Sequence, residues 1–438
     1  MKFTKLSMVA ALLIGSSAFA IENIKVSGDA KVFYSTQDSE YDETAAKNES
    51  AGLLDTSTSM AQAALGLGVS ADLTEGISSG LHITALSTLG LQGQLVDHVW
   101  EETNGVNDYF LFDEAWLAGT LGETTAKAGR MTLDTPMVFT ETWSIAKNTF
   151  EAAVVINQDI PDTTLIAAYV GGTNSNNIVN PVTGGSSDNN SNSTGFGNAG
   201  GTMQKVNDKG NTNFSQFYKG AFAAGAVNNS YKPLTAQAWY YDAPEYLSNY
   251  WLQADLNIEG ILGGLQYTST DYTKSKMLPI AQDTDNDAFA VMLGYEKEDL
   301  VTAKISYSQT GEEKDSTIGL GAGSNLAGSQ SKLYTEAWWY YGKITQADTA
   351  AFNLTVTAPV AGYDLGIYYT QATTGDNGVA GKSDKDFTEA TFEVAKSFGP
   401  LDTGLYYIYT KSDDDNKKSA EKDGDAYNTV QLYLTYNF

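Results

Sequence analysis

Side chains that commonly act as catalysts are scarce in this chain of 438 residues. It contains no cysteine, which excludes a disulfide framework, a thiol nucleophile and a cysteine-ligated metal. Its imidazoles are His82 and His98, and His98 lies in a predicted loop without a neighbouring serine motif. A hydrolase needs a nucleophile with a positioned base, so we expect no catalytic residues and no enzymatic activity.

Two short patterns imitate ligand sites without completing them. The acidic run of residues 283–287 resembles the opening of an EF-hand loop, but Ala288 and Gly294 stand where that loop requires glycine and glutamate. The glycine-rich residues 319–323 lack the Lys-Ser/Thr of a phosphate loop. We expect no cofactor and no built metal site. A loosely bound divalent cation at residues 283–287 or 413–415 stays open as an alternative.

Charge and composition exclude two further classes of protein. The chain has 53 acidic and 26 basic residues, a formal charge of −27, so it lacks the basic surface that nucleic acid binding requires. Its residues are 42% hydrophobic and 11% aromatic, which is enough apolar material to form a core rather than a disordered tail.

The first twenty residues predict export. Lys2 and Lys5 precede an apolar run over residues 6–14, and Ala18 and Ala20 flank the last positions before the expected cleavage site. The apolar run is shorter than the ~20 residues of a spanning helix, so a signal peptide is favoured over a membrane anchor. Removing two lysines leaves 24 basic residues against 53 acidic ones, a charge of −29 for residues 21–438.

Apolar and polar residues alternate along the rest of the chain. At the C-terminus, apolar side chains occupy every second position: Val430, Leu432, Leu434, Tyr436 and Phe438. This period of two also appears in residues 61–73, 301–308, 352–357 and 363–370. A β-strand with this pattern has one apolar face and one wet face.

Three features favour a transmembrane barrel over a soluble secreted sandwich. The polar face carries Gly, Ser, Thr, Asn, Gln and charged residues, as a wall facing a water-filled lumen would. Aromatic residues cluster near predicted strand ends, for example at residues 239–241 and 406–409. Short turns such as residues 74–76 alternate with long polar stretches, which is the outer-membrane arrangement of short periplasmic turns and long external loops.

The long stretches are predicted at residues 36–59, 90–109, 132–149, 172–217, 273–285, 310–332 and 412–424. Between them we count nineteen strand candidates, whereas a bacterial barrel with both termini in the periplasm needs an even number. Leu333–Tyr341 is the weakest candidate because Trp338-Trp339-Tyr340-Tyr341 breaks the alternation. We therefore assign it to a long external loop and predict an all-β, antiparallel barrel of about 18 strands, with a range of 16 to 20. Residues 21–438 form one domain.

The sequence resembles the Opr-type porins, which include major outer-membrane proteins of Gram-negative bacteria. The resemblance is most specific at residues 128–136 and 148–152 and at the aromatic ending Tyr436-Asn437-Phe438. It implies an outer-membrane barrel of about 18 strands, a homotrimer, and recognition of Phe438 by the barrel-assembly machinery. It also implies that residues 132–149 fold back into the lumen and narrow the pore.

A barrel of this width encloses water unless a loop obstructs it, and the charges at the narrowest ring set its selectivity. We expect the constriction at residues 132–149, with Asp134 and Glu141 facing the solute path and Arg130 and Lys147 as basic partners across it. Alternation places further charged side chains on the lumen wall: Lys25, Asp29, Lys31, His82, Lys304, Glu389 and Glu393.

These expectations lead to one leading function and one alternative. The leading function is passive diffusion of ions and small hydrophilic solutes, with a preference for cations because of the charge of −29. The alternative is an adhesin or surface-binding protein that acts through long loops such as residues 172–217. Outer-membrane lipid and lipopolysaccharide are the expected surroundings, with divalent ions bridging acidic loops to lipopolysaccharide phosphates as a hypothesis.

Overall fold

The structure, a computed structural model, describes residues 21–38, 52–91, 93–96, 108–143, 145–173, 215–245, 247–273, 284–313, 316–318, 331–375, 385–414 and 425–438. The predicted signal peptide, residues 174–214 of the longest predicted loop and most of the predicted acidic loop stretches lie outside these residues.

The described residues form eighteen β-strands and two short 3-10 helices. The first nine strands are β1 (Glu22–Gln37), β2 (Ser59–Thr74), β3 (Ile77–Ser87), β4 (Asp108–Leu121), β5 (Thr124–Met131), β6 (Phe150–Asn157), β7 (Thr163–Thr173), β8 (Ser215–Asn228) and β9 (Leu234–Ala243). The second nine are β10 (Leu247–Ile258), β11 (Ile261–Tyr272), β12 (Thr284–Lys297), β13 (Val301–Thr310), β14 (Thr349–Val360), β15 (Tyr363–Thr374), β16 (Lys385–Phe398), β17 (Leu401–Asp414) and β18 (Asp425–Asn437). The helices are η1 (Thr56–Thr58) and η2 (Lys343–Thr345).

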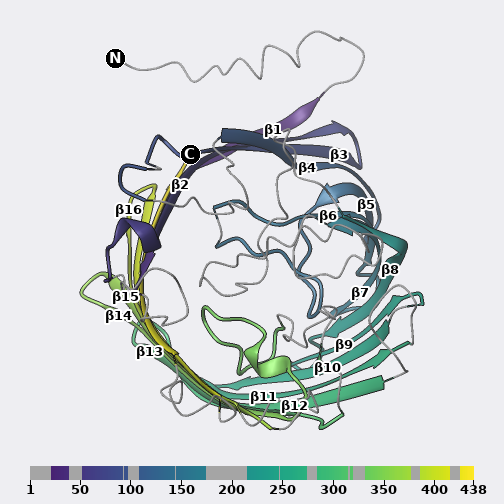
Figure 1. Cartoon of the computed structure of the whole chain (residues 1–438). Coiled ribbons are helices and arrows are strands. Elements are labelled where there is room, and N and C mark those ends of the chain that lie inside the picture. The colour runs from purple at the N-terminus through teal and green to yellow at the C-terminus, as the bar shows by residue number, and fades with distance from the viewer. Residues whose placement is uncertain are drawn as a thin grey trace.

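Each strand pairs antiparallel with the next, and the ring closes where β1 pairs with β18 (Figure 1). The closing register runs from Asp29 opposite Asn437 to Gln37 opposite Thr429. Closure leaves none of these strands as a free edge. The predicted all-β antiparallel barrel of about eighteen strands is confirmed.

The predicted period of two separates the two faces of the wall. On β12 the side chains of Phe289, Val291 and Leu293 are exposed on the outside, while the alternate Ala288 and Ala290 are buried toward the lumen. Exposed leucine, isoleucine, valine and aromatic side chains recur on the outer face of other strands. An apolar exterior on a closed sheet is suited to hydrocarbon, because every backbone polar group is already paired.

The two ends of the barrel differ in the length of their connections. At one end, two-residue turns such as Glu259-Gly260 and Ala361-Gly362 join the strands, and all four of these residues have positive φ. Such turns match the twist of the flanking strands. At the other end lie the long connections, and β5 and β6 leave residues 132–149 between them, the stretch that the sequence predicts as a loop.

Leu333–Tyr341 is not a strand and belongs to the long β13–β14 connection, as predicted, but this connection folds into the barrel. Residues 331–348 lie within the ring of strands and contact its inner wall (Figure 1). The wall of an eighteen-stranded barrel cannot fill its lumen with side chains, so the lumen has room for this segment. No helix among the described residues is long and apolar enough to cross a membrane.

A charged side chain on the outer face should lower stability in lipid. Leu265 of β11 is exposed on this face. We expect Leu265→Arg to reduce the free energy of unfolding in phospholipid vesicles by about 2–4 kcal/mol, the cost of arginine near the bilayer midplane. Urea titration of the folded barrel measures it. Thr302→Arg on the inner face of β13 is the matched control, and equal losses for the two variants would contradict a lipid-facing exterior.

Candidate pore constriction

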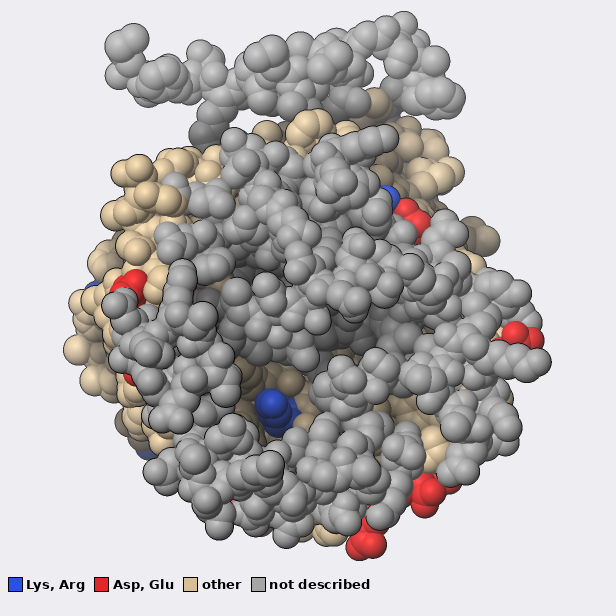
Figure 2. Space-filling model, viewed as in Figure 1, with Lys and Arg blue, Asp and Glu red and all other residues tan. Residues whose placement is uncertain are grey.

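Among the described residues, parts of two connections fold into the lumen, whereas the sequence predicts one. They are the β5–β6 loop (residues 132–149) and the β13–β14 loop (residues 311–348, described at 311–313, 316–318 and 331–348) (Figure 1). Seen along the barrel axis, a hollow opens into the interior, and basic side-chain atoms lie inside it (Figure 2).

The β5–β6 loop has its own hydrogen-bonded structure. Asp134 and Phe139 form an isolated antiparallel bridge, and the Thr140 amide donates to the carbonyl of Leu133 at 2.8 Å. The buried Asn148 accepts a bond from the Glu141 amide at 2.6 Å and donates to the Phe139 carbonyl at 3.1 Å. Because these bonds satisfy its backbone locally, the loop can lie in the lumen as a folded hairpin.

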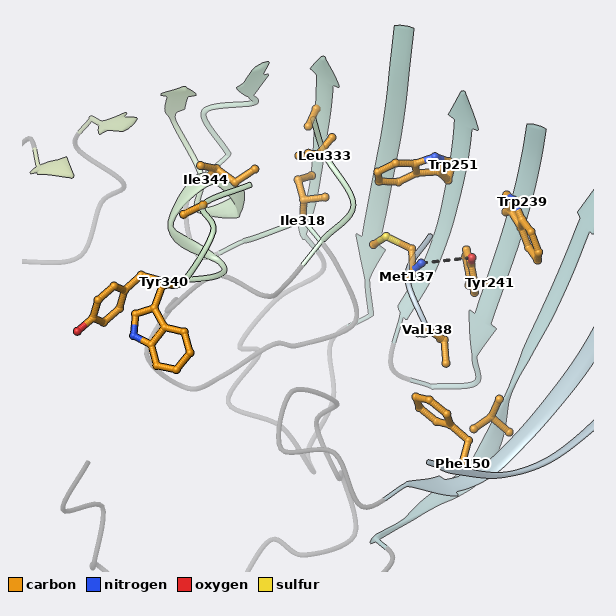
Figure 3. Packing of buried hydrophobic residues seen from close by; sticks show 14 of the residues in the cluster. Met137, Val138, Phe150, Trp239, Tyr241, Trp251, Ile318, Leu333, Tyr340 and Ile344 are labelled. Atoms are coloured by element: carbon orange, nitrogen blue, oxygen red, sulfur yellow. Dashed lines mark hydrogen bonds between the residues drawn. The ribbon is translucent and has the colours of Figure 1, made fainter. Parts of the chain in front are cut away.

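The tip of this hairpin packs on the wall formed by β9 and β10. The Met137 amide donates to the Tyr241 hydroxyl at 3.4 Å (Figure 3). Met137 and Val138 are buried in one cluster with Trp239 and Trp251. A lumen-facing wall that is aromatic at this place therefore holds the hairpin by apolar burial as well as by a hydrogen bond.

The other end of the hairpin is held by charges on the inner face of β4. Lys147 pairs with Glu114, and its ammonium lies 4.0 Å from a carboxylate oxygen of Asp113. Asp113, 1% exposed, lies 2.7 Å from Nδ1 of His82 and accepts a bond from the Thr84 hydroxyl at 2.9 Å. A buried carboxylate needs such partners to offset its desolvation.

This group of charges continues along the inner wall. Asp29 of β1 lies 3.9 Å from Nε2 of His82 and 3.6 Å from the ammonium of Lys31. The indole of Trp116 donates to Glu114 at 3.2 Å, and the ammonium of Lys127 lies 4.0 Å from a ring centroid of Trp116. Positive and negative groups thus alternate across β1, β3, β4 and β5.

The β13–β14 loop contacts two parts of the wall that flank the strands it joins. On one side the Tyr334 hydroxyl donates to Asp255 of β10 at 2.5 Å, and the Tyr334 amide donates to Gln266 of β11 at 2.9 Å. On the other side the amides of Trp339 and Tyr340 each donate to a carboxylate oxygen of Glu389 on β16, both at 2.8 Å. Glu389 is 1% exposed and ties the loop to the wall.

A second buried carboxylate organises the loop from within. Glu336 accepts bonds from the Gly342 amide at 2.9 Å and from the amide and hydroxyl of Ser331 at 3.1 and 2.9 Å. Burial raises the pKa of Glu336 to about 7, although these hydrogen bonds act in the opposite direction. The loop therefore contains a carboxyl group that titrates near neutral pH.

The two loops meet in the lumen through one ion pair and a set of rings. Lys332 pairs with Asp134, and the Lys332 ammonium also lies 5.0 Å from the centroid of Phe139. The rings of Trp143 and Trp339 contact edge to face with centroids 5.1 Å apart. The Asp134 side chain is 85% exposed, so it borders the open part of the lumen. The constriction is accordingly built by both loops.

The four residues expected at the constriction have different places. Asp134 borders the lumen, and Glu141 lies half-buried in the same loop. Lys147 turns toward the wall and pairs with Glu114, so it does not lie across from Asp134. The place expected for Arg130 is wrong. Arg130 shares a face with the exposed Ala115 and pairs with Glu151 at 2.8 Å, because it alternates with the lumen-facing Met131 and therefore points outward.

The seven residues expected on the wall lie on its inner face. Lys25, Asp29, Lys31, His82 and Lys304 lie there by register and alternation. Glu393 accepts bonds from the hydroxyls of Tyr368 and Tyr406 at 2.6 and 2.9 Å. Glu389 also points inward, but the β13–β14 loop covers it, so it meets backbone amides in place of the expected water.

Several residues of the site escape the sequence analysis. Asp113 and Glu114 fall where the β3–β4 register shifts between His82 and Ile83, so strict alternation cannot place both on the inner face. Lys332 stands at the end of a stretch assigned to the outside. The sequence does contain one sign that this loop is buried. Residues 338–341 are four consecutive aromatic residues, which is unusual for a loop in water.

Among the described residues, no three histidine, aspartate or glutamate side chains gather so that they could hold a metal ion. Of the predicted acidic run, residues 284–287 begin β12, while residue 283 lies outside the described part of the chain. Of the alternative cation site at residues 413–415, residues 413 and 414 end β17, while residue 415 lies outside the described part of the chain.

Comparison with known proteins finds similar solved structures. No protein-family model and no curated protein matches the sequence. The crystal structure of Pseudomonas aeruginosa OccK8 (OprE) superposes with a TM-score of 0.66 at 16% identity, covering 96% of this chain and 99% of that one. P. aeruginosa OccK3 (OpdO) gives 0.62 at 14% identity, covering 95% and 96%. The P. aeruginosa outer membrane protein OpdK gives 0.62 at 13% identity, covering 94% and 98%. This likeness confirms the barrel fold that the sequence resemblance implied.

Titration of Glu336 should change the stability of the β13–β14 loop. Its pKa in the fold exceeds the ordinary value of 4.5, so its contribution is fully present below pH 4.5 and is lost as the pH rises through about 7. We expect faster hydrogen exchange of residues 331–348 at pH 8 than at pH 5.5, after correction for intrinsic rates.

The Glu336→Gln variant mimics the protonated form and should show a smaller pH dependence, with the remainder coming from groups such as Glu389 that also bind this loop. Glu312→Gln, an exposed position of the same loop, is the matched control and should behave as the unmodified chain does. A pH dependence that is unchanged in Glu336→Gln would assign the effect to another group.

Proposed function

We propose that the chain is a porin, an outer-membrane channel for passive diffusion of ions and small hydrophilic solutes. The observation that carries this proposal is a closed barrel whose apolar exterior encloses a charged lumen narrowed by two folded loops. Solutes pass such a lumen according to its width and to the charges at its narrowest part. The absence of a catalytic constellation in the sequence agrees with a channel rather than an enzyme.

The outer membrane of a Gram-negative bacterium is the location that fits this fold. Exposed apolar side chains surround the wall, and the similar structures include one described as an outer membrane protein. Phe438 completes the barrel, because its amide and carbonyl exchange hydrogen bonds with Gly28 at 2.9 and 2.8 Å while its side chain stays 52% exposed. Such a terminal ring is accessible to the assembly machinery. Export by a signal peptide, homotrimer assembly and contact with lipopolysaccharide complete the proposal and derive from the sequence.

Cation preference follows from the charges beside the solute path. The charge of −29 favours cations near the mouths of the channel. At the constriction, Lys147 and Lys332 are each paired with a carboxylate, and Arg130 lies on the outside. Asp134 is the most exposed member of these pairs, so its charge acts most directly on a passing ion.

The adhesin alternative depends on long loops such as residues 172–217, of which 174–214 lie outside the described residues. No observation on the described residues favours it over a channel.

Conductance across a planar bilayer tests the channel. For residues 21–438 in folded form we expect stepwise, ohmic openings and a reversal potential that shows cation preference in a salt gradient. Asp134→Asn should lower the cation-to-anion permeability ratio by about 1.4-fold to fivefold, because an exposed charge contributes about 0.2–1 kcal/mol.

Arg130→Gln is the matched control, since this residue lies on the outer face and its loss should leave the permeability ratio unchanged. A folded, β-rich protein that never conducts would overturn the channel, and anion selectivity would overturn the cation preference.

A further inference from the structure

A cavity of about 470 Å³ lies where the two inward loops meet the wall. The β5–β6 loop contributes Thr142, Trp143 and Ile145, and the β13–β14 loop contributes residues around Trp338. The wall side comes from β1, β17 and β18. This volume lies within the range of small-molecule sites.

Aromatic rings dominate the lining. Those that line the cavity include Trp143, Trp338, Trp339, Tyr341, Tyr406 and Tyr433. Trp338 stacks on Tyr406 with centroids 4.5 Å apart, and Tyr406 meets Tyr433 edge to face at 5.3 Å. The rings are therefore held in fixed orientations by one another. Three of the seven tryptophans in the chain gather here.

Carboxylates stand directly behind this aromatic lining. Glu393 accepts the hydroxyl of Tyr406 at 2.9 Å, and Glu389 accepts the amide of Trp339 at 2.8 Å. Tyr341 lies within the electrostatic reach of Glu141, Glu336 and Glu389. Burial first, and then these charges, raise the pKa of the Tyr341 hydroxyl well above its ordinary value, so this ring stays neutral.

One basic residue lines the cavity among those described, and it is already paired. Lys31 lies 3.6 Å from Asp29, so the two charges cancel at that side. The remaining electrostatic character comes from the ring faces and from the carboxylates behind them, and both attract positive charge. An anionic solute would find no unpaired base in this lining.

We propose that this cavity is a binding site for small organic cations of the alkylated ammonium class, which pause there as they pass the constriction. The inference rests on the proposed channel and adds a solute class to it. An alkylated ammonium suits the site because its methyl groups bury against rings while its charge is stabilised by their faces. A hydrated metal ion is unsuited to the site, because it would lose part of its hydration shell to a lining that offers few oxygen ligands in return.

The test uses choline and its uncharged isostere 3,3-dimethyl-1-butanol, with benzoate as the anionic probe. Binding is followed by tryptophan fluorescence of the folded chain in detergent and by interruption of single-channel current in bilayers. We expect choline to bind about tenfold more tightly than the isostere, the scale of a desolvated cation–π contact. Benzoate should bind more weakly still.

Four substitutions locate the effect. Glu393→Gln should weaken choline severalfold without changing the isostere, and Glu298→Gln, at an exposed turn between β12 and β13, is its matched control. Trp338→Leu should abolish the preference for choline. Trp338→Phe keeps a ring on Tyr406 and should retain most of it, which guards against loss through misfolding alone.

Equal binding of choline and the isostere would overturn the inference, as would tighter binding of benzoate. So would choline binding that survives both Glu393→Gln and Trp338→Leu. A chain that conducts but ignores choline keeps the channel and loses the cation site. A chain that binds choline selectively in the fluorescence assay but never conducts keeps the site and loses the channel.

Discussion

Hydrogen-bonded closure between the first and last strands is the constraint on which the rest of the structure depends. The register of β1 against β18 turns an eighteen-stranded sheet into a ring, and the bonds between Gly28 and Phe438 extend that seam to the end of the chain. With every strand paired on both sides, the exterior can be apolar without exposing backbone polar groups to lipid. The same ring is too wide to be filled by its own side chains, so its interior needs water, loops or both.

Buried carboxylates and aromatic packing hold the two inward loops against the wall. Glu389 and Glu336 accept backbone amides of the β13–β14 loop, and Asp113 with Glu114 holds Lys147 of the β5–β6 loop. A carboxylate withdrawn from water is costly unless several donors replace the water. Here loop amides and a lysine supply them, so the charged wall and the loops stabilise each other. The lumen is consequently divided into a packed, largely dry part and an open part bordered by Asp134.

The packed part and the aromatic cavity have a common origin. Rings from both loops must cover one another and the wall, and rigid rings rarely fill an irregular space completely. The remaining space is lined by ring faces with carboxylates behind them. In a strongly acidic protein, this arrangement links the overall charge to a local preference for positive, partly apolar solutes.

The sequence by itself determined the barrel, because a period of two is a local property of each strand. Alternation separated the exposed Ile305 and Tyr307 from the buried Ser306 and Ser308, and it indicated that Leu333–Tyr341 is not a strand. It also delimited residues 132–149, because the flanking strands end in a recognisable pattern.

Tertiary structure alone decided which charges meet. Asp134 and Lys332 are 198 positions apart, and no periodicity relates them. The register shift beside His82 brings Asp113 and Glu114 together on the inner face, where they hold Lys147. Likewise, alternation predicts Glu389 as a hydrated residue of the lumen wall, whereas in the structure the β13–β14 loop covers it. Such contacts depend on where long loops come to rest, and that is settled by packing and desolvation across the lumen rather than by neighbouring residues.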